Sequence, residues 1–452
     1  MKRIITALTL TVVFATFVGC GPTQETLEPT EAPVEPTEAA VEPTEAPVAP
    51  TEEPAPEEEV FKIGILGPHT GPSSRVGEEL WGGGVMGFEE IGNRIGHYKI
   101  ELVKVDSESD PEKATRAYEE AIVRQDLDMA MMSWHSSVAV ACMEVSGKHE
   151  FLHFIPGGAT EVINEKYESD PDRFSWWIGK NWPVPSKLSS AYVSTLEDAI
   201  EKGLWSPETR TAVVYGEDTD WGRSFGKAIR GQLEDAGWEI VSEDYFGLDE
   251  VEFYPLLKKW EADNVALLAG TSTSPPSISS LIKQAREVEL EALIIADGLG
   301  WVGEWYDLTG DSSDYVLDQI PQWTTDEARA FRDEFEERFG FQPSPSAAGL
   351  ASYDVVGFFV QIASEVYEEH GQLNGDLLHE AIWDKIRADQ FTYADAIIMN
   401  EYKFSEESFP DPVVGQDYYI FPVIQYFGGE SNLVWPDDWK DADLQIPSWA
   451  GG

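Results

Sequence analysis

The sequence predicts an α/β protein built on parallel sheets, and three observations carry this prediction. From Phe61 onward, short apolar runs alternate with helix-length segments in the order βαβαβαβ, which favours a parallel sheet with right-handed crossovers. The pattern breaks at 181–185 (NWPVP), and a second series of the same kind follows. The chain has 452 residues, enough for two compact units. We therefore expect two sheets, each covered by its own helices.

The first series begins with an apolar strand and an amphipathic helix. The helix carries apolar residues on one face but also contains Gly82, Gly83 and Gly84. Each glycine destabilises a helix by about 1 kcal/mol relative to alanine, so we expect another segment to approach its backbone closely. The expected strands are 61–66, 99–105, 129–132 and 151–155, and the expected helices are 78–95, 111–124 and 138–148.

The second series repeats the alternation and ends in a helical region. After a helix at 186–202, we expect strands at 211–215, 239–245, 265–268 and 292–296, with helices at 221–236, 252–262 and 276–289 between them. A strand at 315–319 then leads to helices at 325–339, 347–370 and 377–388. A last strand at 418–426 precedes a tail containing Trp435, Trp439 and Trp449, for which packing is the only role that the sequence indicates.

Two polar turns in the first series predict a ligand site. Ser136-Ser137 follows one apolar run, and Gly157-Gly158-Ala159-Thr160 follows the next. If the runs are neighbouring parallel strands, both turns lie at the same sheet edge, where open α/β sheets bind ligands. Hydroxyls and free backbone N–H groups at such turns favour an anion. The alternative is that Ser and Gly serve the turns alone.

The N-terminus predicts export and a lipid anchor. Lys2-Arg3 precedes an apolar run, 4–18, that is short for a membrane span of roughly 20 residues and has the form of a secretory signal. Gly19 and Cys20 follow the run, and residues 17–20 resemble the end of a bacterial lipoprotein signal (with Phe17 where Leu is usual), which implies lipidation of Cys20. An ordinary signal peptide is the alternative.

Residues 21–59 predict a Pro/Glu/Thr-rich, disordered tether. They contain twelve Glu and three seven-residue units, EPTEAPV, EPTEAAV and EPTEAPV. Repeated proline excludes a coiled coil. An extended chain of about 3.1 Å per residue could hold the globular part roughly 100 Å from a membrane.

The charge and cysteine content narrow the choice of partners. The formal net charge is −52, which disfavours nucleic acids and anionic membrane surfaces as partners. The two cysteines are Cys20 and Cys142, so lipidation of Cys20 would leave no disulfide within the chain.

Two short motifs suggest enzymes but lack the required context. His149-Glu150-Phe151-Leu152-His153 matches the zinc-protease pattern H-E-x-x-H, with Glu165 or Glu168 as a third ligand, but the apolar residues favour a strand over the helix that zinc binding needs. The segment 298–303 (GLGWVG) matches a dinucleotide fingerprint, yet only a short segment follows it. We therefore expect no enzyme, no metal and no cofactor.

Several segments in order carry a resemblance to a known family. They are KIGILGPHTGPSSRVG, VKVDSESDP, the Ser-Ser turn, HFIPGGAT, GEDTDWGRS, IKQAREVEL and ADGLG. From Phe61 to about Tyr426 the chain resembles type I periplasmic binding proteins of the branched-chain amino acid (leucine/isoleucine/valine) ABC-importer family. The resemblance implies two Rossmann-like lobes with parallel sheets, joined by a three-stranded hinge. Lobe one would be 60–183 plus 317–394, and lobe two 184–316 plus 395–452.

The resemblance also implies a ligand site in the cleft between the lobes. The residues that match the family's carboxylate site are Ser136, Ser137, Gly158 and Thr160. Asp297 matches the residue that binds the ligand ammonium, and Trp221 the aromatic cap. Thr271 stands where another aromatic is usual, and Val76 replaces an aromatic in the first loop. Ser107 and Trp134 stand near the places of the family's frequent disulfide. Secondary aromatic candidates are Trp176, Trp177, Trp182, Trp301 and Trp305.

The function implied is capture of a small solute outside the cytoplasm. We expect a monomeric, lipid-anchored receptor that closes on an amino acid or similar zwitterion and delivers it to an ABC permease. The alternative is a sensory module of the same fold that reports to a membrane receptor. A remote alternative is a zinc hydrolase acting through His149, Glu150 and His153.

Overall fold

The computed structural model describes residues 58–415, 417–419 and 422–451. Residues 56–452 form one compact unit, and all of the structure discussed below lies in its described part. The predicted signal sequence, Cys20 and nearly all of the predicted tether lie outside the described residues.

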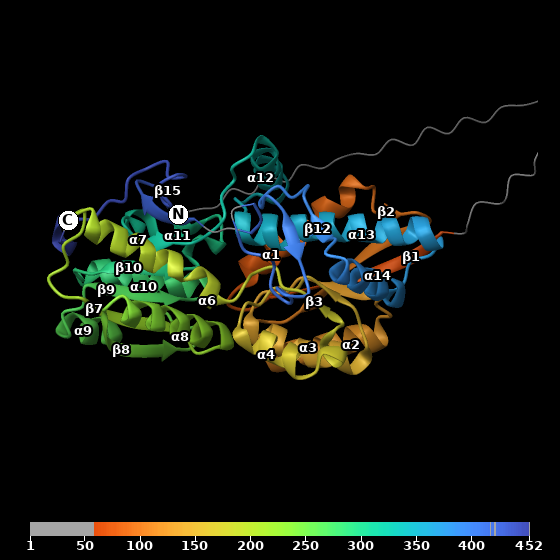
Figure 1. Cartoon of the computed structure of the whole chain (residues 1–452), viewed down its shortest axis with the longest axis horizontal. Helices are drawn as coiled ribbons and strands as arrows, with labels where there is room; N and C mark the ends of the chain where they lie inside the picture. Colours follow the sequence, from red (N-terminus) through yellow and green to blue (C-terminus); the bar gives the residue numbers. More distant parts are fainter. Residues whose placement is uncertain (1–57, 416, 420–421, 452) are drawn as a thin grey trace, which may run out of the picture. The chain divides into compact units, whose positions relative to one another are not determined.

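The first sheet has six strands in the order β2-β3-β1-β4-β5-β6 (Figure 1). Neighbouring strands are parallel except the short antiparallel pair β2–β3, and β1 pairs with β3 along its whole length. The alternation of strand and helix predicted from the sequence is confirmed here. The strands are β1 (Glu59–Gly67), β2 (Arg94–Ile95), β3 (Tyr98–Asp106), β4 (Met129–Met131), β5 (His153–Phe154) and β6 (Trp177–Ile178).

Local sequence explains where the helices of this lobe begin. Helix α2 (Pro111–Arg124) has proline in its first turn, and Asp110 Oδ1 accepts from the Lys113 N–H at 2.9 Å. Helix α4 (Glu161–Ser169) is capped by Thr160 in the same way. The other helices of this series are α1 (Ser74–Glu90), α3 (Ser136–His149) and α5 (Pro171–Phe174).

The second sheet has seven strands in the order β15-β14-β11-β10-β9-β7-β8. Strands β7 to β11 are parallel, whereas β14 runs antiparallel to both β11 and β15. The strands are β7 (Thr211–Glu217), β8 (Glu239–Phe246), β9 (Leu267–Thr271), β10 (Leu293–Asp297), β11 (Leu317–Asp318), β14 (Val423–Phe427) and β15 (Glu430–Trp435). The helices are α6 (Pro185–Leu188), α7 (Ser190–Glu201), α8 (Asp220–Asp235), α9 (Tyr254–Ala262), α10 (Pro275–Glu287) and α11 (Trp305–Thr309).

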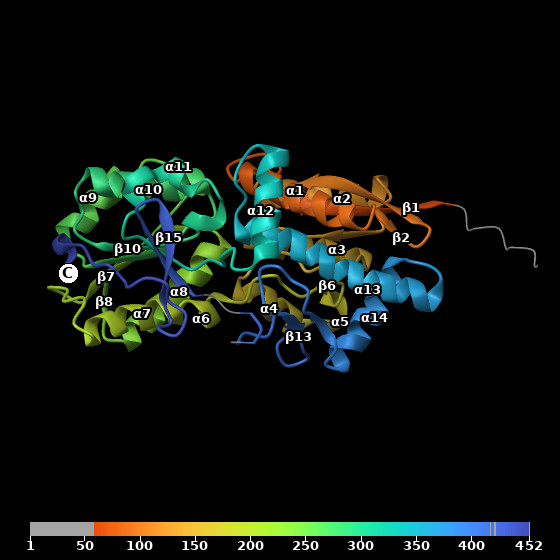
Figure 2. The same ribbon diagram turned by 90° about the horizontal axis from the view of Figure 1, so that it is seen from above.

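A later helical segment returns to the first lobe, where α13 runs beside α1 (Figure 2). It comprises α12 (Asp326–Phe339), the π-helical turns η3 (Pro345–Tyr353), α13 (Asp354–His370) and α14 (Gly375–Arg387). The predicted close approach to the α1 glycines is confirmed, because a Cβ at Gly83 would lie 2.4 Å from the carbonyl oxygen of Ala348. Glycine therefore lets η3 pack directly on α1.

The chain passes between the two lobes three times, after β6, after β11 and between β13 (Tyr402–Phe404) and β14. A buried ion pair, Lys180 Nζ to Asp411 Oδ1 at 2.6 Å, ties the first crossing to the third. Two segments lie in the other lobe from the one that the expected boundaries gave them. Strand β11 belongs to the second sheet because it pairs with β10 and β14, and β13 pairs with β12 (Phe391–Tyr393), which packs on α13 and α14.

One helical stretch of the described residues, Pro345–His370, is long and apolar enough to cross a membrane. Its mean hydropathy is 1.3, and 78% of its most apolar window is buried inside the protein. It is accounted for as the core helix of the first lobe, where Phe358, Phe359 and Ile362 are all buried.

The Trp-rich tail packs on the second lobe. Trp435 ends β15, and its Nε1–H donates to Asp198 on α7 at 3.1 Å. The guanidinium of Arg286 lies over the ring of Trp449. The strand β15 was not expected from the sequence; it forms because β14 and β15 are joined by a tight Gly428-Gly429 turn in which both glycines have positive φ.

Candidate ligand-binding site

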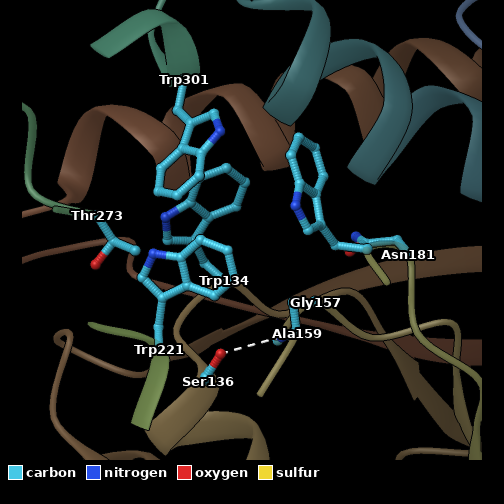
Figure 3. Close-up of a pocket in the computed structure, with 10 residues that line it drawn as sticks. Trp134, Ser136, Gly157, Ala159, Asn181, Trp221, Thr273 and Trp301 are labelled. Carbon is cyan, nitrogen blue, oxygen red and sulfur yellow. Dashed lines mark hydrogen bonds between the residues drawn. The ribbon is translucent and has the colours of Figure 1, made fainter. Parts of the chain in front are cut away.

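A small cavity lies where the carboxyl ends of both sheets meet the first crossing (Figure 3). Its empty volume is about 360 Å³ including open solvent, but only about 40 Å³ is open to the centre of a water molecule. The walls come from both lobes and from the crossing itself. They are formed by Trp134, Ser136, Gly157, Gly158, Ala159, Asn181, Trp182, Trp221, Thr273 and Trp301.

The floor of the cavity is made by the two polar turns that the sequence singled out. Because β4 and β5 are parallel neighbours, the turns meet at one edge, and the Ala159 N–H donates to Ser136 Oγ at 3.0 Å (Figure 3). Gly157 must be glycine, since a Cβ there would lie 2.0 Å from the carbonyl oxygen of Ser133. Ser136 also begins α3, so its hydroxyl stands at a helix N-terminus.

Four indole rings form the walls, and we call Trp134, Trp182, Trp221 and Trp301 the tryptophan box. Trp301 lies at its centre, with ring centroids 5.6 Å from Trp134, 5.6 Å from Trp221 and 6.1 Å from Trp182. The planes are steeply inclined, by 88°, 57° and 85° respectively. The rings therefore present edges and faces to the cavity from several directions.

Thr271 holds one wall of the box in place. The Trp221 Nε1–H donates to Thr271 Oγ1 at 2.8 Å, and that hydroxyl donates to the carbonyl oxygen of Asp297 at 2.8 Å. Thr271 is fully buried and does not line the cavity. The structure thus places Thr271 behind Trp221.

Three buried N–H groups at the cavity have no hydrogen-bond partner within the described residues. They are Nε1 of Trp134, Nε1 of Trp301 and Nδ2 of Asn181. Buried donors are paired in nearly all folded proteins, so an unpaired set around a cavity indicates that a bound molecule supplies acceptors.

Thr273 is the point at which the two lobes meet over the cavity. Its carbonyl oxygen accepts from Ser73 Oγ at 2.8 Å, and its hydroxyl lies 2.9 Å from His135 Nδ1, both in the first lobe. Its N–H and its hydroxyl donate to the buried carboxylate of Glu217. Burial raises the pKa of Glu217 and lowers that of His135 to about 4. This network holds the lobes together in a closed arrangement.

Ser137 and Thr160 also bridge the lobes and do not line the cavity. Ser137 Oγ accepts from the Asp220 N–H at 3.0 Å, and Thr160 Oγ1 lies 2.7 Å from Ser224 Oγ. The predicted site residues Ser136, Gly158 and Trp221 therefore come together at the cavity, whereas these two lie at the lobe contact beside it.

Asp297 lies behind the cavity and is not among the residues that line it. It is 5% exposed, and its Oδ2 accepts from Tyr192 Oη at 2.9 Å. Burial, followed by the nearby carboxyl of Asp318, raises the pKa of Asp297 well above its usual range. Because two buried carboxylates repel each other, the Asp297–Asp318 pair favours a state in which one of the two carboxyl groups is protonated.

The HEFLH motif does not form a metal site. His149 ends α3 and faces Glu119, whereas His153 lies on β5. His153 Nδ1 lies 2.9 Å from Tyr118 Oη, and its Nε2 lies 2.5 Å from the carbonyl oxygen of Met132, so both ring nitrogens are used. Among the described residues, no cluster of three His, Cys, Asp or Glu could hold a metal ion.

The backbone N–H groups of the GLGWVG motif bind a carboxylate of the protein itself. The N–H groups of Gly298 and Gly300 donate to Asp318 at 3.0 and 2.8 Å, so Asp318 occupies the place of a phosphate. The motif opens only a 3₁₀ turn, η1 (Leu299–Trp301). A dinucleotide has no binding turn here.

Sequence reasoning missed several residues of the cavity and ranked others too low. Trp134, Asn181 and Thr273 were not proposed as ligand contacts, and Trp182 and Trp301 were secondary. A signal existed for three of them, because Trp134, Thr273 and Trp301 each closely follow the end of a parallel strand, at the edge where such sheets bind ligands. The other secondary candidates, Trp176, Trp177 and Trp305, do not line the cavity.

The two lobes are joined by three crossings and enclose a cavity at the ends of their parallel strands. This arrangement defines a class of binding protein in which two lobes close on a ligand. Residues 60–425 match the model of the family described as "Periplasmic binding protein", and the chain belongs to this family. Its members bind solutes outside the cytoplasm and are not enzymes.

Individual relatives agree with this membership. An "Amino acid binding protein" from Pseudomonas aeruginosa is 26% identical over 238 residues. That alignment spans 52% of this chain and 59% of the relative, so the match covers little more than half of each.

Solved structures share the fold. A leucine-binding protein from Thermotoga maritima superposes with a TM-score of 0.65 at 17% identity, over 84% of this chain and 99% of that one. A solute-binding protein from Rhodopseudomonas palustris, solved with 3,4-dihydroxybenzoic acid, has a TM-score of 0.65 at 18% identity, over 86% and 99%.

Proposed function

We propose that the protein captures a small carboxylate-bearing zwitterion, an amino acid or a related solute, between its lobes and delivers it to an ABC importer. The observation that carries the proposal is the cavity, where unpaired N–H donors and indole rings surround a space that both lobes are needed to close. The curated relative named for amino acid binding supports the same class of ligand.

The floor of the cavity is the proposed carboxylate site. The Ser136 hydroxyl accepts from Ala159 and so has its own hydrogen free to donate, and it stands at the N-terminus of α3, a helix of 14 residues. Gly158 and the donors of Trp301 and Asn181 complete a set that suits carboxylate oxygens. Trp221 covers the ligand from the second lobe, positioned by Thr271.

Capture is proposed to proceed by hinge closure. In the open form the cleft admits the solute, and closure forms the Ser73–Thr273, His135–Thr273, Ser137–Asp220 and Thr160–Ser224 contacts around it. Ser137 and Thr160, predicted as ligand residues, are thus proposed to stabilise the closed form. The transporter would then select the closed, loaded protein.

The N-terminal region supplies the proposed location. Lipidation of Cys20 would anchor the protein outside the cytoplasm, and residues 21–59 would act as a tether. Labelling with a palmitate analogue should mark the wild type and not Cys20→Ser, and a protein left unlabelled in both would refute the anchor.

A thermal-shift screen against amino acids, N-methylated amino acids and organic acids, followed by calorimetry, tests the binding function. A ligand that binds the folded state alone raises the melting temperature, with a stabilisation of about 2.7 kcal/mol at a hundredfold excess over Kd. We expect at least one carboxylate-bearing compound to bind with 1:1 stoichiometry. If none of these classes shifts the transition, the proposed ligand class is wrong.

A further inference from the structure

We propose that the solute bound in the tryptophan box carries a quaternary ammonium group, which the indole faces hold, together with a carboxylate held by the floor of the cavity. Such a solute is a fully N-methylated amino acid. The inference rests on the proposed function of the cavity and narrows its ligand class. It is carried by the chemistry of the lining and by the geometry of the rings.

The lining contains no countercharge for an ordinary ammonium group. Among the ten described residues that form the cavity, none is Asp or Glu. Glu217 and Asp297 both lie outside this lining. Glu217 accepts from Thr273 and Thr219, and Asp297 accepts from Tyr192 through Oδ2, while Asp297 Oδ1 has no partner among the described residues. A primary ammonium brings three N–H donors that require acceptors. A quaternary ammonium brings none.

The unpaired polar atoms at the cavity are donors as well. Trp134 Nε1–H, Trp301 Nε1–H and the Asn181 amide would compete with a primary ammonium, because all of them seek acceptors. They suit the carboxylate end of a zwitterion. The cationic end is left to the indole faces, and indole is the aromatic ring that attracts cations most strongly.

The inclination of the rings favours a compact group over a flat one. The planes of Trp221, Trp182 and Trp134 are inclined to that of Trp301 by 57°, 85° and 88°, so Trp301 forms no parallel pair with any of them. A flat aromatic ligand is best held between parallel faces in offset stacks. A tetrahedral group with methyls on every side contacts inclined rings equally well.

Calorimetry with a methylation series tests the inference on the full-length mature protein. The ligands are glycine, N,N-dimethylglycine, trimethylglycine and 3,3-dimethylbutanoate, which has the shape and carboxylate of trimethylglycine without its positive charge. We expect trimethylglycine to bind at least tenfold more tightly than dimethylglycine, glycine or the uncharged analogue. Equal binding of trimethylglycine and 3,3-dimethylbutanoate would overturn the cation–π assignment, since shape alone would then decide.

Two further titrations distinguish a failure of this inference from a failure of the proposed function. Leucine and benzoate are titrated in parallel. If either binds and trimethylglycine does not, the cavity is a solute site but the quaternary ammonium inference is wrong. If none of the six compounds binds while a wider solute screen yields a ligand without a quaternary ammonium, the inference is again overturned and solute binding stands. Failure of every compound in both screens would refute both.

Variants of the box provide a second readout. Trp134→Leu keeps an apolar side chain at a half-buried position but removes the ring and its N–H donor. Both ligands lose the donor to the carboxylate, but only trimethylglycine loses a cation–π contact, so we expect its affinity to fall at least tenfold more than that of 3,3-dimethylbutanoate. Trp134→Phe should retain part of the affinity. Trp176→Phe is the matched control, because Trp176 is also half-buried but stacks on His379 away from the cavity. Equal losses for both ligands in Trp134→Leu would mean that the ring acts by packing alone.

Discussion

His135 Nδ1 lies 2.9 Å from Thr273 Oγ1, and this contact joins the first lobe to the second directly over the cavity. The same threonine accepts from Ser73 through its carbonyl oxygen and donates to Glu217 through its hydroxyl. One residue therefore connects the closing surface of one lobe to a buried carboxylate of the other. Closure and the shape of the ligand cavity are linked through Thr273.

Replacing this hydroxyl should weaken the closed state. In Thr273→Val, His135 loses its partner and Glu217 loses a donor, and an unpaired buried polar group is destabilising by about 1–3 kcal/mol. We expect ligand affinity to fall roughly tenfold or more, with a larger radius of gyration by small-angle scattering at equal ligand occupancy. Thr195→Val is the control, because Thr195 is similarly buried and its hydroxyl donates to the carbonyl oxygen of Ala191 within its own helix, α7. Wild-type affinity in Thr273→Val would contradict the role of Thr273 in holding the lobes closed.

The two adjacent serines should behave differently. Ser136 lines the cavity. We expect Ser136→Ala to remove a hydrogen bond to a charged ligand group and so to weaken binding by about 1.5–3 kcal/mol, or roughly 10- to 100-fold. Ser137 accepts from the Asp220 N–H across the lobes, so Ser137→Ala should lower affinity only a few-fold through closure. Calorimetry on both variants measures the difference. A greater loss in Ser137→Ala than in Ser136→Ala would reverse the assignment.

Asp297 offers a direct comparison between the family resemblance and the geometry. The resemblance implies that Asp297 binds the ligand ammonium, whereas its side chain bonds to Tyr192 and lies outside the cavity lining. From the geometry we expect Asp297→Asn to change ligand affinity less than about threefold, because a protonated carboxyl and an amide are close in shape. Calorimetry decides between the two. A large loss of affinity would support the ammonium role.

The sequence predicted the edge of the site better than its walls. The turns at Ser136 and Gly158 could be placed together because neighbouring parallel strands end at one edge. The tryptophan box could not be assembled in the same way, since its members come from four separate segments and the chain has 16 Trp. Core and site tryptophans are equally apolar, so local pattern does not distinguish Trp301 in the box from Trp260 in the core.

The fold was likewise predicted in part, in its element order but not in all of its strand pairing. The strand and helix order of both lobes follows from hydrophobic periodicity and was predicted. The short strand β11 was expected in the first lobe but pairs with β14, about a hundred residues later in the chain. Pairing at such a separation is decided by tertiary packing and leaves no local sequence signal.

The buried carboxyl of Glu79 should give stability a distinct pH dependence. Burial raises its pKa to about 8 from 4.5, although Ser344 donates to it through both N–H and Oγ. The folded state therefore binds more protons than the unfolded state between these values. The contribution of Glu79 to stability is complete below about pH 4.5 and is lost as pH rises through about 8, at up to about 1.4 kcal/mol per pH unit.

Denaturant unfolding of wild type and Glu79→Gln between pH 5 and 8.5 isolates this effect. Gln cannot ionise, so we expect the variant to lose less stability than the wild type as pH rises, with the difference growing in its favour. Buried histidines such as His153, whose pKa is lowered to about 3 by burial, act in the opposite direction, but equally in both proteins. Parallel pH profiles for the two proteins would refute the protonated state of Glu79.

A crystal structure of the protein with the tightest ligand from the solute screen tests the central claim most directly. We predict closed lobes with the ligand inside the tryptophan box, its carboxylate within hydrogen-bonding distance of Ser136 Oγ, and its cationic end against the indole faces, including that of Trp134. Ligand bound outside the cleft, or bound there with the lobes open and Ser136 uncontacted, would contradict the account.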